Sequence, residues 1–497
     1  MGTPTSSRGL GALGSGAVTA LALAIQNGLA AIVGIVAGHE FGRSTTTDGF
    51  NATYGVYIVV SFAAAAIRVA VMPALARARQ ERRLGSEAVA YGLTMTCLSL
   101  PLLLLALTAA GPVAWLLTGA GPTAARDAAA EALPWMIAAA VLQLFAGLAA
   151  SSLAALDNYA TAAAGYALGS AIGLAYILLR MHPDGIIALP RGMALNSAVA
   201  LLVPLLALAN HALAERMPAE AVRPSRHSFH ARTSEIANSI SLPLAMQFIY
   251  LICLALAARQ GVGAQTSFNY AYLIAAAVVT VTGVSLSLVT SVPLTRIGLD
   301  SPRTTRHVVA LSWMAFIAIG ACAGVFGLAG ERIVHVLLGG AYSAQVGSQL
   351  GRLVVVLSLW AITSVAFSVT FPLMFVARKS RRLSLLAPAA LAGHVLVAVV
   401  AAVLGGLEGL ALALALTTAV VVALMLHELG ALRPTARGLG IASITIGVTA
   451  AAAFVLPGLV LEPVWAAAAG CALYAVVLIA TRPRGLSEAW RYLRQLA

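Results

Sequence analysis

The residues of this chain whose chemistry is most readily interpreted are polar side chains set in otherwise apolar segments. One is a cation, Arg68, whose guanidinium can bind phosphate or pyrophosphate through paired hydrogen bonds if it faces a wet cavity. Another is an acid, Asp48, near the start of the same segment. The rest are amides and phenols, which suit hydrogen bonds to sugar hydroxyls: Gln26, Asn27, Asn51, Tyr54, Gln247, Asn269 and Tyr272. Together these side chains predict a binding site for a polar, anionic ligand.

Each of these residues also has a structural interpretation. Arg68 lies six residues before Ala74, about 9 Å along a helix axis, so its side chain can also snorkel to the membrane surface. Asp48 follows Thr45 by three residues and suits the capping of a helix N-terminus. The amides and phenols can pair with one another inside a helix bundle, and Tyr272 also suits an anchor at the membrane interface. The sequence leaves both interpretations open.

The segments that must position these residues are membrane spans. The 497 residues are 60% hydrophobic and only 9% charged, with a mean hydropathy of +0.93, which is too little polar surface for a soluble globule of this length. Apolar runs long enough to cross a bilayer recur along the whole chain and lack the alternation of a membrane barrel, so an all-α polytopic membrane protein is predicted. About fourteen spans are predicted, at 14–37, 50–74, 89–110, 132–155, 160–179, 193–214, 236–258, 266–292, 307–329, 351–376, 384–404, 408–430, 438–459 and 464–481.

The basic residues predict how these spans are oriented. Most of the 30 Lys and Arg residues fall on alternate loops, as in the cluster Arg77, Arg79, Arg82 and Arg83. Because basic loops stay on the cytoplasmic side, both termini are predicted to be cytoplasmic and the chain to lie in the cytoplasmic membrane. The net charge of +13 is spread over these loops without a basic domain, so no nucleic-acid partner is expected.

The chain also carries signs of an internal duplication. The segment 50–54, Phe-Asn-Ala-Thr-Tyr, returns 218 residues later at 268–272 as Phe-Asn-Tyr-Ala-Tyr, and a proline follows each copy. At the same offset Asp48 matches Thr266 and Arg68 matches Leu288, so the charge is confined to the first copy. Two similar halves are typical of carriers that rock about a central path. The predicted organisation is a six-helix lobe at 1–214, a cytoplasmic linker at 215–235, a second six-helix lobe at 236–430, and helices 13 and 14 with a tail at 431–497.

The first copy resembles a known family. Residues 41–50, Phe-Gly-Arg-Ser-Thr-Thr-Thr-Asp-Gly-Phe, leading to Val-Met-Pro-Ala-Leu-Ala at 71–76, resemble the lipid II flippase (MviN-like) family, and the repeat at 268–272 adds a similar signal. The arrangement of six, six and two helices is similar to the wider superfamily of multidrug, oligosaccharidyl-lipid and polysaccharide flippases, the MOP superfamily. The resemblance implies alternating-access transport of a lipid-linked glycan precursor, of peptidoglycan or polysaccharide type, with membrane lipids and a polyprenyl-linked amphiphile as partners.

The sequence departs from that family in its cavity cations. Lipid II flippases line the cavity with arginines from the first, second and eighth helices, whereas this chain has Gln26 and Asn27 in the first and Tyr270 and Tyr272 in the eighth. Arg68 in the second helix is the one basic residue placed inside a predicted span.

Three other functions remain as alternatives. A cation-coupled multidrug exporter of the same superfamily is disfavoured because all 17 carboxylates fall in loops or near helix ends. A membrane glycosyltransferase is disfavoured because the outer loops are short and hold few acids, so a transporter and not an enzyme is expected. The third alternative is a non-transporting scaffold for envelope assembly. No metal or cofactor is expected, since the four cysteines lie far apart without ligand spacing.

Overall fold

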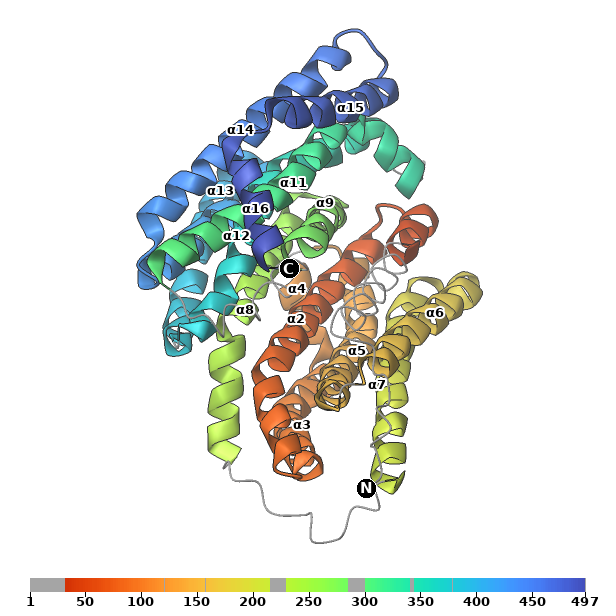
Figure 1. Cartoon of the computed structure of the whole chain (residues 1–497). Helices are drawn as coiled ribbons and strands as arrows, with labels where there is room; N and C mark the ends of the chain where they lie inside the picture. Colours follow the sequence, from red (N-terminus) through yellow and green to blue (C-terminus); the bar gives the residue numbers. More distant parts are fainter. Residues whose placement is uncertain are drawn as a thin grey trace. The chain divides into compact units, whose positions relative to one another are not determined.

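The computed structural model describes residues 32–119, 121–156, 158–214, 229–284, 300–339, 344–377 and 379–496. Every regular element among these residues is a helix, as Figure 1 shows, which confirms the predicted all-α fold. The first part of the chain holds a short apolar helix, Ile32–Phe41, followed by α2 (Thr45–Gln80), α3 (Leu84–Thr108), α4 (Ala110–Thr118), α5 (Thr123–Ala155), α6 (Tyr159–Asp184), the 3-10 turn η1 (Gly185–Ile187) and α7 (Ala188–Ala214).

The second part of the chain begins with a helix that contains a proline and is followed by a short turn. It comprises α8 (Phe229–Ala257), η3 (Ala258–Gln260), α9 (Ala264–Val279) with the π-helical turn η4 (Thr280–Val284), α11 (Ser301–Leu338), α12 (Ala344–Val376), α13 (Ser380–Glu428), α14 (Leu432–Gly458), α15 (Pro463–Thr481) and α16 (Arg484–Leu496).

The helices have the length and apolar composition of membrane spans. Among the described residues, nine helical stretches are long and apolar enough to cross a bilayer. One of them, α13, has 49 residues, and a straight helix of this number would be about 74 Å long, more than twice the hydrocarbon core of about 30 Å. Gly406, with φ 55°, interrupts its helical backbone between the predicted spans 384–404 and 408–430. Gly185, with φ 62°, similarly divides the stretch Ala160–His211. The number of fourteen membrane spans stays a prediction.

The helices group into two compact units. Thr53–Leu117 and Arg126–Leu244 form most of unit 1, and Ile35–Ala52, Thr118–Ala125 and Ala245–Ala497 form unit 2. Several boundaries pass through helices; α2, for example, changes unit after Ala52, and α8 changes unit after Leu244. The predicted lobes at 1–214 and 236–430 stay a prediction.

Unit 1 is held together by apolar side chains from four helices. The first part of α8 joins this core through Ile236, which is buried with side chains of α2, α3 and α5. The core consists of Ile67, Val71, Ala74, Leu75, Tyr91, Met95, Leu144, Leu148, Ala155 and Ile236. The packing of α6 on α7 depends on close backbone approach, since a Cβ at Gly169 would lie 2.5 Å from the carbonyl oxygen of Asn196. Small residues therefore fix this helix pair.

Unit 2 is organised around α11, which packs against α12, α14 and α15. Its start is capped by Asp300, whose carboxylate accepts a hydrogen bond from the backbone N–H of Arg303 at 2.7 Å. Trp313 and Phe316 of α11 are buried in this unit. The segment Ile35–Ala52 and α9 belong to the same unit, which brings residues 50–52 of the first copy of the motif into one compact body with the second copy.

Candidate functional site

The acid predicted at the start of α2 binds the start of a different helix. Asp48 lies in the first turn of α2, but the hydroxyl of Ser44 caps that turn, accepting from the N–H of Thr47 at 3.2 Å. The Asp48 carboxylate instead accepts hydrogen bonds from the N–H of Gly263 at 2.6 Å and from the N–H and hydroxyl of Thr266 at 3.0 and 2.6 Å. The sequence predicted that Asp48 caps the start of its own helix, but the carboxylate caps the start of α9 instead. The partial positive charge of the α9 N-terminus explains the preference for a carboxylate there.

A two-glycine turn prepares α9 to receive this carboxylate. Gly261 and Gly263 both have left-handed backbones, with φ of 121° and 77°, a conformation that glycine adopts without steric cost. Arg43 holds the same turn from the other side, donating from Nε to the carbonyl of Gly263 at 3.1 Å and from a terminal nitrogen to the carbonyl of Val262 at 3.3 Å. The guanidinium leaves no room for a larger residue, since a Cβ at Gly263 would lie 2.4 Å from Arg43 Nε.

One helical turn further along, the two asparagines of the repeated motif bind each other. Asn269 Nδ2 donates to Asn51 Oδ1 at 2.6 Å, and Asn51 Nδ2 donates to the hydroxyl of Thr266 at 3.0 Å. Tyr250 of α8 donates its hydroxyl to Asn269 Oδ1 at 2.6 Å. Asp48, Asn51, Tyr250, Thr266 and Asn269 thus form one continuous hydrogen-bonded group, called here the amide cluster.

The amide cluster joins equivalent positions of the duplicated sequence. Asp48 contacts Thr266 and Asn51 contacts Asn269, and both pairs are 218 residues apart, which is the offset of the repeat. Equivalent residues meet in this way where two copies of a motif face each other about a local two-fold axis. The two matching segments therefore bind each other, and Asp48 supplies a charge that the second segment lacks.

An aromatic group extends the amide cluster within unit 2. The rings of Tyr250 and Tyr272 stack with their centroids 3.9 Å apart, and Tyr272 lies 4.7 Å from the ring of Trp360 on α12. The hydroxyl of Tyr272 donates to Gln247 Oε1 at 3.4 Å. Tyr272 is 2% exposed, so it is a packing residue here and not an interfacial anchor.

Two further polar side chains lie in the first turn of α9 without partners. Gln265 Nε2 and Ser267 Oγ are both buried, and neither has a hydrogen-bond partner within the described residues. An unsatisfied buried polar group raises the free energy of the state that contains it. The same turn therefore combines a fully bonded carboxylate with polar atoms that a more hydrated state would satisfy.

The structure brings together five of the nine predicted site residues. Four of them, Asp48, Asn51, Asn269 and Gln247, are buried and hydrogen-bonded in unit 2 together with Tyr272. Tyr54 lies in unit 1, half-buried, with its ring stacked on that of Tyr57 at a centroid distance of 5.9 Å. Arg68 lies in α2, but its side chain is outside the described part of the structure. Gln26 and Asn27 also lie outside the described residues.

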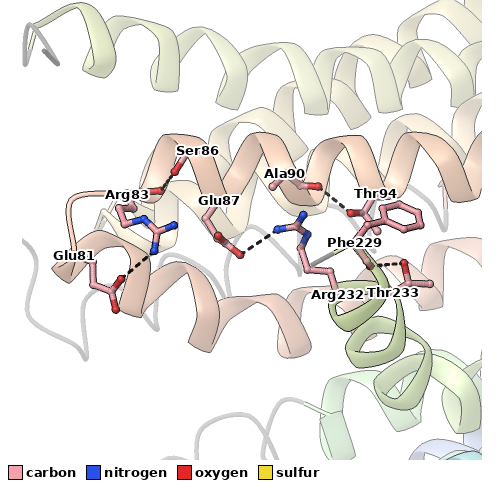
Figure 2. Close-up of polar contacts among 9 residues, drawn as sticks. All are labelled: Glu81, Arg83, Ser86, Glu87, Ala90, Thr94, Phe229, Arg232 and Thr233. Atoms are coloured by element: carbon pink, nitrogen blue, oxygen red, sulfur yellow. Dashed lines mark hydrogen bonds and ion pairs between the residues drawn. The ribbon is translucent and has the colours of Figure 1, made fainter. Parts of the chain in front are cut away.

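Sequence reasoning missed a second polar group, which lies in unit 1. Glu87 of α3 and Arg232 of α8 are both buried and form an ion pair at 3.9 Å, and the guanidinium of Arg232 lies 6.0 Å from the ring centroid of Tyr91. The neighbouring pair of Arg83 and Glu81 has a separation of 3.3 Å. Figure 2 shows these four charged residues at the junction of α2, α3 and α8. They are called here the charge cluster.

A buried histidine of unit 2 is also hydrogen-bonded. His394 Nδ1 lies 2.8 Å from the hydroxyl of Thr417, and its Nε2 lies 3.3 Å from the Cys253 sulfur. Within the described ranges, no group of three or more His, Cys, Asp or Glu side chains is arranged to hold a metal ion. The polar chemistry of the described sites is therefore hydrogen bonding and ion pairing.

Comparison with solved structures identifies the fold. The chain superposes on the lipid II flippase MurJ in its inward closed conformation with a TM-score of 0.72 at 13% identity, covering 94% of this chain and 99% of that one. An inward-facing multidrug resistance MATE transporter of the MOP superfamily gives 0.64 at 16% identity, covering 86% and 99%. A MOP superfamily transporter from Pyrococcus furiosus gives 0.55 at 16% identity, covering 84% and 95%.

Comparison at the level of sequence adds no closer relative. No protein-family model matches the chain, and no curated protein matches it. The similarity therefore lies in three-dimensional structure, over nearly the full length of MurJ, as the resemblance of residues 41–50 and 71–76 implied. The chain therefore shares its fold with MurJ and with these two transporters.

Proposed function

We propose that this protein is an alternating-access flippase or exporter, which moves a lipid-linked glycan precursor of peptidoglycan or polysaccharide type across the cytoplasmic membrane. The observation that carries this proposal is the amide cluster. It binds the start of α2 to the start of α9 through equivalent residues of the two repeats. In a carrier built from two repeats, such a contact is suited to closing one end of the transport path.

The amide cluster has the properties expected of a contact that opens and closes. Its members are short neutral side chains and one carboxylate, all of which water can solvate if the contact separates. Gln265 and Ser267 beside it carry buried polar atoms without partners, which hydration would satisfy. The free-energy difference between a closed and an open state is thereby kept small, as exchange between two conformations requires.

The polar head of the cargo is assigned to residues of the first repeat. Arg68 supplies the positive charge for a phosphate or pyrophosphate, while Gln26, Asn27 and Tyr54 supply hydrogen bonds for sugar hydroxyls. In the closed state the cargo has less access to Asn51, Asn269 and Gln247, because these side chains are bonded to protein partners. The polyprenyl chain stays in the bilayer, and both termini of the protein are cytoplasmic.

A reversible crosslink tests the role of the amide cluster. Asn51→Cys and Asn269→Cys are combined in a chain whose native cysteines are replaced, and the pair is joined with a reducible bismaleimide. Vesicles containing the protein are loaded with a polyprenyl-diphosphate-linked disaccharide, and its movement between leaflets is followed by its access to an added enzyme. We expect crosslinking to abolish movement and reduction to restore it. Each single cysteine variant, treated with the same reagent, is the control.

Cargo class is tested separately in cells. Depletion of the protein should cause a lipid-linked glycan to accumulate on the cytoplasmic leaflet, and Arg68→Ala should reproduce this effect while Arg68→Lys reproduces it in part. Transport of fluorescent cations under a proton or sodium gradient, with no accumulating glycan, would favour the multidrug exporter, whose fold this chain also shares. Full complementation by a chain with Arg68, Asn27 and Asn269 all replaced by alanine would favour the non-transporting scaffold.

A further inference from the structure

The last helix differs from the helices before it in composition and position. Helix α15, an apolar span of 19 residues, ends at Thr481, and α16 begins three residues later at Arg484. A span of this length matches the hydrocarbon core without excess, so the start of α16 lies at the membrane surface. Figure 1 shows α16 leaving the direction of α15 and crossing α11.

One face of α16 is fixed on α11. Ala489 is 1% exposed, and the hydroxyl of Tyr492 lies 3.1 Å from Nδ1 of the buried His307. At the start of the helix, a Cβ at Gly485 would lie 2.4 Å from Nε1 of Trp313, so glycine allows the two helices to approach closely. These contacts set which face of α16 points away from the protein.

The outward face of α16 is basic. Arg484, Arg491 and Arg494 are all exposed, and their spacing of seven and three residues places them on one side of a helix. Arg482 lies exposed just before the helix, and Glu488 is the only acid in its sequence. The exposed side of the helix therefore carries a net positive charge.

Trp490 lies at the edge of this basic face. Its side chain is 50% exposed, and the guanidinium of Arg494 lies 5.3 Å from its ring centroid. Tryptophan beside arginine is typical of segments that lie at the lipid headgroups, where the indole ring enters the interface and the guanidinium meets phosphate. An exposed indole on a soluble face would have no comparable apolar environment.

We propose that α16 binds the anionic phospholipid headgroups of the leaflet at which α15 ends. Arg484, Arg491 and Arg494 contact the phosphates, and Trp490 inserts at the interface. The contact on α11 transmits this binding to unit 2, since α11 packs against three other helices of that unit. The lipid composition of the leaflet thereby affects the order of the C-terminal end of the protein.

Hydrogen exchange of the full chain in nanodiscs tests this proposal. The protein is placed in nanodiscs of phosphatidylcholine alone or of phosphatidylcholine with phosphatidylglycerol, and exchange is measured for peptides covering 484–494. We expect exchange to be about tenfold slower with phosphatidylglycerol. The triple variant Arg484→Gln, Arg491→Gln, Arg494→Gln should lose this difference, and Glu488→Gln should enlarge it by removing the opposing charge.

Exchange in residues 301–313 of α11 reports whether the triple variant keeps its fold, because this segment includes the His307 and Trp313 contacts. Equal exchange of α16 in both nanodiscs for the unmodified chain would overturn the proposal. So would a triple variant that keeps its protection by phosphatidylglycerol. If α11 loses protection in the triple variant, fluorescence of the unmodified chain decides the question, with Trp490→Phe as the control that isolates the signal of Trp490. Stronger quenching of this signal by brominated phosphatidylglycerol than by brominated phosphatidylcholine supports the proposal, and equal quenching overturns it.

Discussion

The amide cluster of unit 2 is buried, as are three of the four residues of the charge cluster of unit 1, but the two clusters are built from opposite kinds of side chain. The amide cluster uses short, mostly neutral groups with hydrogen bonds between 2.6 and 3.0 Å. The charge cluster uses long charged side chains, with ion pairs at 3.3 and 3.9 Å and an arginine over a tyrosine ring. The first joins α2 to α9, and the second joins the start of α8 to α3.

This difference in chemistry implies a difference in mechanical role. Hydrogen bonds between neutral groups depend steeply on distance and are replaced by water at little cost, so such a contact separates cleanly. A buried ion pair weakens only gradually with distance, and separating it leaves two charges that water must reach. We therefore expect the amide cluster to open during function and the charge cluster to stay closed.

The largest effect is expected from breaking the charge cluster. Glu87→Gln leaves the buried Arg232 without its counter-charge, and this should destabilise the protein by about 3 kcal/mol. Thermal unfolding in detergent measures the effect. The double variant Glu87→Gln, Arg232→Gln should be more stable than either single variant, because it removes the uncompensated charge together with its partner.

An exposed ion pair provides the matched control. Glu408 lies 3.4 Å from Arg352, and the side chains are 47% and 66% exposed. Glu408→Gln should change stability by less than about 1 kcal/mol, since water screens this pair. If Glu87→Gln reduces stability no more than Glu408→Gln does, the charge cluster does not hold α8 on α3. The proposed difference in role between the two clusters would then be wrong.

The next effect is expected at the charged end of the amide cluster. Asp48→Asn removes the negative charge from the α9 N-terminus and places an NH₂ group near one of the backbone donors, so a loss of about 2 kcal/mol is expected. Transport should fall as well if the closed state is part of the cycle. Asp300→Asn at the exposed start of α11 is the control, and it should cost only a few tenths of a kcal/mol because Asn and Asp are similar N-caps there. Equal losses at both positions would contradict a special role for Asp48.

The sequence predicted several side chains of the amide cluster but not which residues they bind. Asn51 and Asn269 were found through the repeat, and their burial follows from polar groups avoiding lipid. Thr266 was interpreted as the residue that replaces Asp48 in the second copy, yet it is the residue that Asp48 binds. A repeat offset gives equivalence along the chain, and only the three-dimensional packing shows that equivalent residues face each other.

The charge cluster was harder to predict from sequence. Hydropathy marks spans by their apolar residues, so Glu87 and Arg232 were placed in loops outside the spans 89–110 and 236–258. The helices extend further than the apolar runs, and α8 begins at Phe229, which places Arg232 in its first turn. A charge becomes buried where a distant partner compensates it, and a single sequence does not reveal such a pair.

The turn that presents α9 should respond to the loss of its glycine. Gly263→Ala forces a Cβ into a left-handed backbone and against Arg43, and a destabilisation of about 1 to 2 kcal/mol is expected. Gly430→Ala places a Cβ at a similar φ of 69° with open space around it, so it reports the backbone cost without the contact. Thermal unfolding of both variants gives the contribution of the Arg43 contact by difference. Identical unfolding temperatures would mean that Arg43 does not hold this turn.

The smallest effect, and the sharpest test of the comparison, is the coupling between the two asparagines. Asn51→Ala and Asn269→Ala each remove the same hydrogen bond between the two amides, so the double variant should lose less stability than the sum of the two single variants. Hydrogen bonds between membrane helices contribute about 0.6 to 1.7 kcal/mol, which sets the expected coupling. If the contact opens during transport, the coupling free energy should be present under conditions in which the Asn51→Cys, Asn269→Cys pair can be crosslinked. It should be absent under conditions in which this crosslink does not form. A coupling that persists at full strength under conditions that block crosslinking would mean that the amide cluster, like the charge cluster, is a permanent attachment.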